Sequence, residues 1–273
     1  MRPFIHIGIP FSVLLLVSGL LLVSTRGIAQ AGAPDNDAGS TVAGSTGGAS
    51  GPVRFVTAGT IEFERKENLR NEFQGEGDFA DEIRKTLPEN KISYFNLSFS
   101  GNLSLFEPGR ENPDNVRLWD APGSNNIIYA DRNTNRQVSQ KSLFGTDILL
   151  GDTLRSLHWK ITSDTRIIAG FECRRATTVI LDSIFVVAFY TDEILPSAGP
   201  ESFGGLPGMI LGMVIPKLHT SWYATKLTLG EPKAMLPPRK GKKMTYAELS
   251  ETIKQAIKDW GDWGKTILMR IMV

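Results

Sequence analysis

The chain has 273 residues, of which 41% are hydrophobic, and a formal net charge of +1 at pH 7. Its 30 basic residues almost balance its 29 acidic ones, which argues against the clustered positive charge of a nucleic-acid-binding protein, so we expect no nucleic-acid partner. Cys173 is the only cysteine, which excludes an internal disulfide and leaves the packing of apolar side chains to hold the fold together.

The first 31 residues are typical of a secretory signal peptide. Arg2 supplies a short positive region, residues 11–23 are apolar, and Ala29-Gln30-Ala31 matches a small-x-small cleavage site. The apolar run is shorter than the roughly 20 residues that a membrane span requires. We therefore expect residues 1–31 to be a signal peptide without a lipobox, and the mature protein to be periplasmic or extracellular with no stable membrane span. A retained N-terminal anchor is the alternative.

Composition divides the rest of the chain into three parts. Residues 32–51 are mostly Gly, Ala, Ser, Thr and Asp, and they cannot bury enough apolar surface to offset the entropy lost on ordering, so they predict a flexible low-complexity linker. Residues 52–263 are long enough for one substantial domain. Residues 264–273 form an apolar tail, for which an added edge strand is one possibility.

Alternation of apolar and polar side chains dominates the domain and predicts antiparallel strands. In residues 95–105 five apolar side chains alternate with Asn and Ser, which predicts one long strand or a hairpin bent at Gly101. Further strands, separated by breaks rich in Asn, Asp, Gly and Pro, are expected at 57–63, 126–130, 137–143, 147–150, 157–162, 171–179, 184–190, 209–214 and 222–229.

Two helices are expected beside these strands. Residues 71–87 give a weak helical pattern that two glycines interrupt. Residues 245–260 give a strong one, because Thr245 and Glu248 make a capping box and the apolar residues fall on one stripe. That stripe consists of Tyr246, Leu249, Ile253, Ile257 and Trp260. The expected fold class is therefore mainly β (α+β), with an antiparallel curved sheet or half-barrel and a C-terminal amphipathic helix packed on it.

The most distinctive segment is 199–211, with the sequence GPESFGGLPGMIL, which contains four glycines and two prolines. Proline presets φ for the first corner of a turn, and glycine adopts positive φ without a steric penalty. Leu206-Pro207-Gly208 therefore predicts a type II turn, with Gly208 at positive φ, that opens onto the strand 209–214.

Four segments carry motifs that occur together: Ile168–Ala176, Ala188–Ile194, Gly199–Phe203 and Gly205–Leu211. They resemble the GLPGLI family of exported Bacteroidetes proteins, named for its Gly-Leu-Pro-Gly-Leu-Ile signature. The likeness is tight over 167–211 and looser over 57–260, and the departures at Phe189 and Met209 keep the apolar bulk. The family has no established activity, so the resemblance implies an exported β-rich domain. We assign a ligand-binding or structural role to Gly199, Pro200, Gly205, Leu206, Pro207 and Gly208.

The sequence gives little support to catalysis. It contains no Gly-x-Ser-x-Gly motif, and Ser202 has no predicted base. Asp192 and Glu193 are adjacent, and adjacent side chains on a strand point to opposite faces, so they do not form a carboxylate pair. We assign no catalytic residue.

Metal binding has a weak basis. The soft or borderline ligands of the mature chain show no recognised ligand spacing, although Cu(I) accepts side chains of these types. We therefore assign no metal and no cofactor, and expect Cys173 to be buried and inert. The side chains concerned are His158, Cys173, Met209, Met213 and His219.

Three functions stay open at this stage. The preferred one is a non-enzymatic binding or assembly role in the cell envelope, with a lipid, peptide or envelope protein as the partner. A curved sheet over a helix would leave an apolar concavity for it, and the exposed backbone of the signature would pair with an extended segment. The alternatives are an envelope metal-binding protein or hydrolytic enzyme, and a purely structural surface component in which the signature only turns the chain.

Overall fold

The computed structural model describes residues 55–72, 78–115 and 122–273, which belong to a compact unit spanning Ser50–Val273. The predicted signal peptide and linker lie outside the described residues, as do residues 73–77 of the weaker predicted helix. In the described part, no helix is long and apolar enough to cross a membrane.

The strands are β1 Ala58–Asn68, β2 Asn90–Ser100, β3 Leu103–Pro108, β4 Ile127–Asp131, β5 Arg136–Leu143, β6 Thr146–Thr153, β7 Lys160–Ile168, β8 Phe171–Ile180, β9 Ile184–Thr191, β10 Met209–Ile215, β11 Thr220–Leu229 and β12 Lys242–Met244. The helices are α2 Leu69–Glu72, α3 Asp78–Thr86, η1 Pro216–Leu218, α4 Tyr246–Ala256 and α5 Gly261–Met272.

The strands form one open sheet in the order β12-β6-β5-β4-β3-β2-β1-β11-β10-β9-β8-β7, which confirms the predicted mainly β class. Neighbouring strands are antiparallel, as expected, except that β12 lies parallel to β6. A parallel pair needs a long connection, and here the chain between β6 and β12 first builds β7 to β11. Residues 242–244 therefore contribute a short edge strand.

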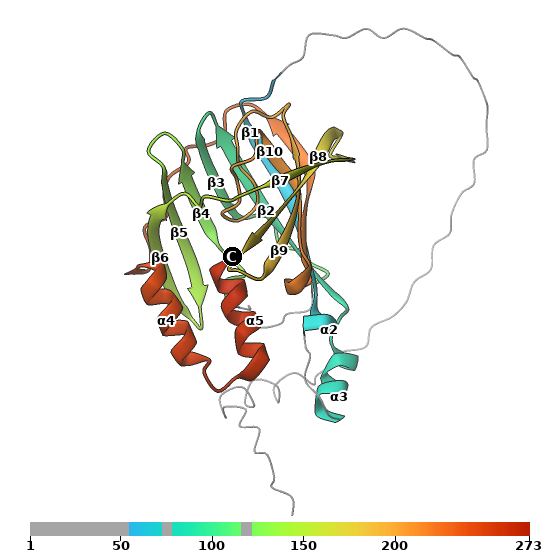
Figure 1. The fold of residues 1–273 in the computed structure, drawn as a ribbon, viewed down its shortest axis with the longest axis vertical. Coiled ribbons are helices and arrows are strands. Elements are labelled where there is room, and N and C mark those ends of the chain that lie inside the picture. The colour runs from blue at the N-terminus through green and yellow to red at the C-terminus, as the bar shows by residue number, and fades with distance from the viewer. Residues whose placement is uncertain (1–54, 73–77, 116–121) are drawn as a thin grey trace, which may run out of the picture. The chain divides into compact units, whose positions relative to one another are not determined.

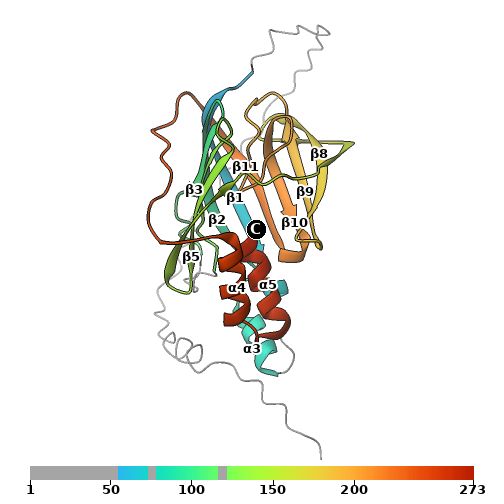
Figure 2. The ribbon, with the colours of Figure 1, turned by 60° about the vertical axis from the view of Figure 1, so that its left-hand side comes forward.

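The sheet is bent into two halves that face each other across the main core (Figures 1 and 2). Alternate residues of β1 and β2 point inward and are buried, among them Ile61, Phe63, Leu97 and Phe99. They meet the inward side chains of β8 to β11 in one apolar cluster. Burial of such large side chains contributes about 1.5–3 kcal/mol each, which makes this cluster the main stabilising feature of the fold.

The predicted strands appear with small shifts of their ends. Residues 95–105 form the bent hairpin β2–β3, with Gly101 at a φ of 53° in the turn, rather than one long strand. Residues 157–159 were expected to be part of a strand, but β7 begins only at Lys160. The side chains of Leu157 and Trp159 instead pack on the main core while the chain crosses from β6 to β7. Their alternation reflects this packing and not strand pairing.

Helix α4 confirms the stronger helix prediction. Its N-cap is Thr245, and the Thr245 hydroxyl accepts from the Glu248 amide at 3.2 Å while the Glu248 carboxylate accepts from the Thr245 amide at 2.8 Å. Leu249, Ile253 and Ile257 are buried, and Trp260 is half-buried. The weaker prediction, 71–87, is realised as the two short helices α2 and α3.

The possibility that residues 266–273 add an edge strand is wrong, because residues 266–272 lie in α5 and Val273 is its C-cap. Buried Gly264, Ile267 and Ile271 are spaced by three and four residues, which is the period of a helix and not of a strand. Helices α4 and α5 lie side by side below β5 and β6 (Figures 1 and 2). Their apolar faces form a second, smaller core with Leu143 and Ile148.

Candidate functional site

The signature loop, residues 192–208, connects β9 to β10. Gly208 has a φ of 138°, so the expected positive φ is confirmed, but the turn is not type II. The Gly208 amide donates to the Leu206 carbonyl at 2.8 Å, which closes a three-residue γ-turn around Pro207. The Met209 amide, which a type II turn would direct to Leu206, donates to the Ile194 carbonyl at 3.1 Å instead.

The loop needs glycine because other segments pass close to it. A Cβ on Gly208 would lie 2.0 Å from the Thr191 carbonyl oxygen, and one on Gly199 would lie 2.8 Å from Cβ of Ile210. Real Cβ atoms essentially never approach other atoms this closely. Of the other assigned signature residues, Pro200 and Leu206 are buried, whereas Gly205 and Pro207 are exposed.

The backbone of the loop is largely engaged within the protein. The Gly205 amide donates to the Ser197 hydroxyl at 2.8 Å, and the Ile210 amide donates to the Ala198 carbonyl at 2.8 Å. The amides of Gly205, Gly208 and Ile210 therefore already have partners within the protein. Strand addition at the loop would require such amides to be free. The geometry therefore favours a structural role for the signature.

The signature loop also anchors the edge strand β7. Just before β7, the Trp159 indole N–H donates to the Gly204 carbonyl at 2.9 Å. Gly205 lies against the same indole, because a Cβ added there would be 3.7 Å from Trp159 Nε1. At the far end of β7, Ile168 fills the space over Gly212, where an added Cβ would be 2.8 Å from Ile168 Cδ1. Both ends of β7 are thus held by glycines of one segment.

Strand β7 is the exposed edge of the sheet. It pairs with β8 on one side only, and Ser163–Ile167 are all exposed. Ile161 is 47% exposed and Ile167 is 68% exposed, so the edge presents apolar side chains to solvent. The register of β7 with β8 shifts between Ile161 and Thr165. The resulting bulge separates a short paired stretch, residues 160–161, from a longer one, residues 165–168.

A second feature is a set of ionisable side chains buried between the sheet and α5. We call Arg65, Glu67, Lys141, Glu201 and Arg270 the buried charged cluster; each is at most 8% exposed. Buried ionic groups are costly unless they are paired, so their contacts decide what the cluster does.

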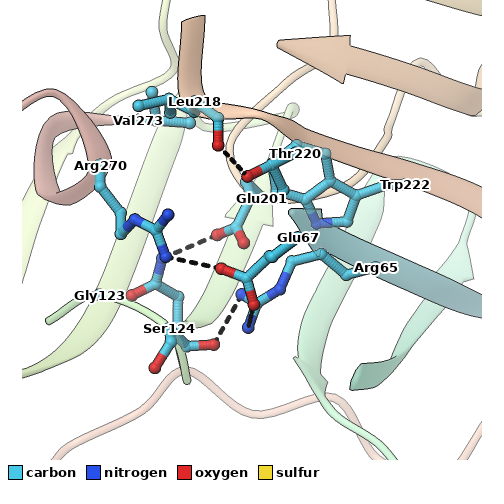
Figure 3. A pocket seen from close by; sticks show the side chains of 11 residues that line it. Arg65, Glu67, Gly123, Ser124, Glu201, Leu218, Thr220, Trp222, Arg270 and Val273 are labelled. Carbon is cyan, nitrogen blue, oxygen red and sulfur yellow. Dashed lines mark hydrogen bonds and ion pairs between the residues drawn. The ribbon is translucent and has the colours of Figure 1, made fainter. Parts of the chain in front are cut away.

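Glu67 is the centre of the ion pairs in the cluster (Figure 3). Its carboxylate lies 3.1 Å from a guanidinium nitrogen of Arg65 and 2.6 Å from one of Arg270, while Arg65 also donates to the Ser124 carbonyl at 2.8 Å. Burial by itself would raise the pKa of Glu67, but Arg65 and Arg270 outweigh burial and lower it. Strand β1 and helix α5 are thus joined through an ionised carboxylate.

Glu201 comes from the signature loop. Its carboxylate accepts from the Asn126 side-chain amide at 2.8 Å and points toward the Arg270 guanidinium (Figure 3). Burial raises the pKa of Glu201, against the opposing effect of Lys141. The residue also has a φ of 54°, an unfavourable backbone conformation for a side chain other than glycine. The surrounding structure therefore holds Glu201 in a strained, poorly solvated position.

Lys141 and Arg155 bind the C-terminal end of α5. The Lys141 ammonium donates to the Ile271 carbonyl at 2.7 Å, and the Arg155 guanidinium donates to the Met272 carbonyl at 2.7 Å. The last carbonyls of a helix have no partner within the helix, and cations are favourable there. Burial nevertheless lowers the pKa of Lys141 to about 8. Both cations thus have a structural role as helix caps.

The cavity beside this cluster is small and polar. It has a volume of about 20 Å³ and is lined by residues that include Arg65, Glu67, Glu201 and Trp222 (Figure 3). The expected open apolar concavity between sheet and helix is therefore wrong for the described residues. The main core, the signature loop and the end of α5 fill that space.

The side chains considered as metal ligands have different surroundings. Cys173, Met209 and Met213 are buried in the main core, and burial raises the pKa of the Cys173 thiol to about 12, as expected for an inert cysteine. His158 is exposed, and His219 ends the short helix η1 with a φ of 48°. In the described ranges, no three His, Cys, Asp or Glu side chains come together as a metal site.

Asp192 and Glu193, which are adjacent in the sequence, do not form a carboxylate pair in the structure. Asp192 is exposed and lies 3.6 Å from Arg174, and Glu193 is half-buried. Glu201 and Lys141 were not among the predicted site residues. A signal for Glu201 existed, because it is the only charged residue in the glycine-rich segment 199–211. Lys141 gave none, since its neighbours Gln140 and Ser142 are also polar and no alternation marks the buried face there.

Comparison with known proteins gives a partial family match and no activity. A family model described as a protein of unknown function (Porph_ging) matches residues 178–212, which include β9, the signature loop and Gly212. The chain is also similar to two structures of PNGF-II, in space groups P21 and C2. The identities are 14% and 15%, the TM-scores 0.48 and 0.47, and the matches cover 72% and 75% of this chain. The chain spans 33% of each matched structure, and a likeness this remote carries no conclusion about function. No curated protein matches the chain.

Proposed function

We propose that this protein is an exported GLPGLI-type domain with a non-enzymatic binding or assembly role in the cell envelope. Its ligand is an extended polypeptide segment that adds to the free edge of β7. The observation that carries this proposal is the fixed and exposed edge strand. Main-chain hydrogen bonds along such an edge give affinity, and contacts with alternate side chains give specificity.

The family-matched segment supports the proposal because it supplies the anchors of β7. Gly204 binds Trp159 before the strand, and Gly212 receives Ile168 at its end. Both glycines lie within residues 178–212. Holding the strand in place before binding reduces the ordering cost of binding. The signature thus acts through β7 and does not need to touch the ligand.

The side chains of the edge indicate what kind of segment it suits. Ile161 and Ile167 offer exposed apolar contacts, and Lys160 adds a positive charge next to the first. An extended segment with alternating apolar side chains would fit this end of the sheet.

We do not assign catalysis to the buried charged cluster. The shifted pKa values of its members accompany structural contacts: Lys141 caps α5, and Glu67 joins β1 to α5. The neighbouring cavity has the volume of about one water molecule, and a substrate would need several hundred Å³.

Site-specific photocrosslinking in the native envelope tests the proposed binding edge. A photoreactive amino acid replaces Ile167, and in a matched control it replaces Leu229, which is 67% exposed at the end of β11, a strand from the middle of the sheet order. We expect an adduct at position 167 that maps to one discrete segment of one protein, and none at 229. Equal labelling at both positions, or none at either, would contradict a specific edge site and favour a purely structural role.

Export has its own test. If the signal-peptide interpretation is right, N-terminal sequencing of protein isolated from its own cells should give a chain that begins near Gly32. A chain that begins at Met1 and stays with the membranes would instead indicate a retained anchor.

A further inference from the structure

The cavity between β1, β11 and α5 is lined by residues that include three with a buried polar atom lacking a hydrogen-bond partner. Arg65 Nε, Trp222 Nε1 and Asn126 Oδ1 are buried and have no partner among the described residues. All three residues line the cavity (Figure 3 shows Arg65 and Trp222). A buried polar atom without a partner costs about 1–3 kcal/mol, so three beside one cavity point to a ligand.

The size of the cavity limits that ligand to one small species. Its volume of about 20 Å³ exceeds the 10–15 Å³ or so that one water molecule requires and leaves no room for a ligand with several non-hydrogen atoms. The occupant is therefore a water molecule or a single ion.

The donor and acceptor types distinguish these species. Arg65 Nε and Trp222 Nε1 only donate, so a metal cation cannot satisfy them. Asn126 Oδ1 only accepts, so a halide cannot satisfy it. The orientation of the Asn126 amide is fixed by its other end, where Nδ2 donates to the Glu201 carboxylate at 2.8 Å. A water molecule accepts two hydrogen bonds and donates two, which matches the set.

We propose that the cavity binds one structural water molecule, which accepts from Arg65 Nε and Trp222 Nε1 and donates to Asn126 Oδ1. The water joins β1 and β11 to the residue that orients Glu201. It thereby extends the contacts of the signature loop into the buried charged cluster. This proposal is independent of what binds at β7.

A crystal structure of the mature protein at a resolution that shows ordered water tests this site. We expect one peak in the cavity, within hydrogen-bond distance of all three atoms. Crystals soaked in bromide should give no anomalous peak there. A bromide peak would mean that the Asn126 amide is turned and would overturn the proposal, as would a cavity without density.

The indole proton of Trp222 provides a second readout in solution, and tryptophan substitutions provide its controls. In the parent protein, the indole proton of Trp222 should show a magnetisation-transfer signal to a long-lived water. Trp159→Phe, a matched control that removes an indole N–H bonded to Gly204, should keep that signal. Trp222→Phe should lose the water peak from crystals while the control keeps it. Should Trp222→Phe not fold, the bromide soak and the indole signal of the parent still decide the question.

Discussion

Glu201 shows how much structural constraint one signature residue carries. Its carboxylate is buried beside Asn126 and near Arg270, and its backbone has a positive φ. Such a conformation costs about 1–3 kcal/mol, so the rest of the loop must fix it. The close approaches at Gly199 and Gly208 show how: both glycines let neighbouring strands contact the loop backbone directly.

Gly208→Ala should destabilise the protein by more than about 1 kcal/mol, because the new Cβ meets the Thr191 carbonyl and because alanine disfavours positive φ. Gly151→Ala is the control, since Gly151 has open space around its Cα and no positive φ, and it should change stability by less than about 0.5 kcal/mol. Chemical denaturation measures both. Equal stability of the two variants would show that position 208 is not structurally constrained.

Lys141 predicts a pH dependence of stability. Burial lowers its pKa from 10.5 to about 8 in the folded protein, so between these values the unfolded chain binds more protons. Stability rises with pH wherever that holds. The free energy of unfolding of the parent, relative to Lys141→Met, should therefore rise between pH 8 and 10.5 by roughly 3 kcal/mol and be lowest below pH 8. Lys226→Met, at an exposed position, is the control. A difference that does not change with pH would refute the lowered pKa of Lys141 in the folded protein.

Among the elements, α4 and α5 depend on the sheet for their apolar contacts. Ile253, 2% exposed, packs in the smaller core between α4 and β5–β6. Ile253→Asp places an unpaired charge there and should cost several kcal/mol. Thr252→Asp adds the same charge at an exposed neighbouring position and should be almost neutral. If thermal unfolding of the two variants coincides, α4 is not docked on the sheet.

The contact between the signature loop and β7 is a second relation between elements. Trp159→Phe keeps an aromatic ring but removes the hydrogen bond to Gly204. Amide hydrogen exchange should then become faster in β7, at 160–168, and stay unchanged in the central strands β1 and β2. Uniform exchange changes, or none, would show that the loop does not hold β7.

Strand prediction succeeded where one face is buried, as in β2, where Phe95, Leu97 and Phe99 alternate with polar residues. It failed where an apolar side chain is buried by a contact other than the face of the sheet. Trp159 is apolar because it packs on the signature loop, and Met244 because it reaches the smaller core, so neither showed a strand boundary. Ile267 and Ile271 have helical spacing, but the segment was too short to decide.

The candidate site was only partly predictable. The glycines of the signature indicated an unusual backbone path, which Gly208 confirms. The partners of Glu201 and Lys141 are far away in the sequence: Asn126 is 75 residues from Glu201, and Ile271 is 130 residues from Lys141. Such pairings depend on the strand order, which alternation alone does not determine.

At the scale of the whole molecule, an open sheet has two edges, and here they differ. The edge strand β12 has only three residues and begins with Lys242 and Lys243, features that discourage further strand pairing. The edge strand β7 has nine residues and exposes Ile161 and Ile167. This asymmetry makes β7 the edge to which we assign binding.

Hydrogen exchange of β7 in protein isolated gently from its own envelope, compared with purified protein alone, tests this assignment most directly. If an extended segment occupies the edge, the amides at 160–168 should exchange more slowly in the native isolate, because a partner strand accepts their hydrogen bonds, and those of β12 should exchange at the same rate in both samples. Identical exchange of β7 in the two samples, or protection confined to another surface, would contradict the account.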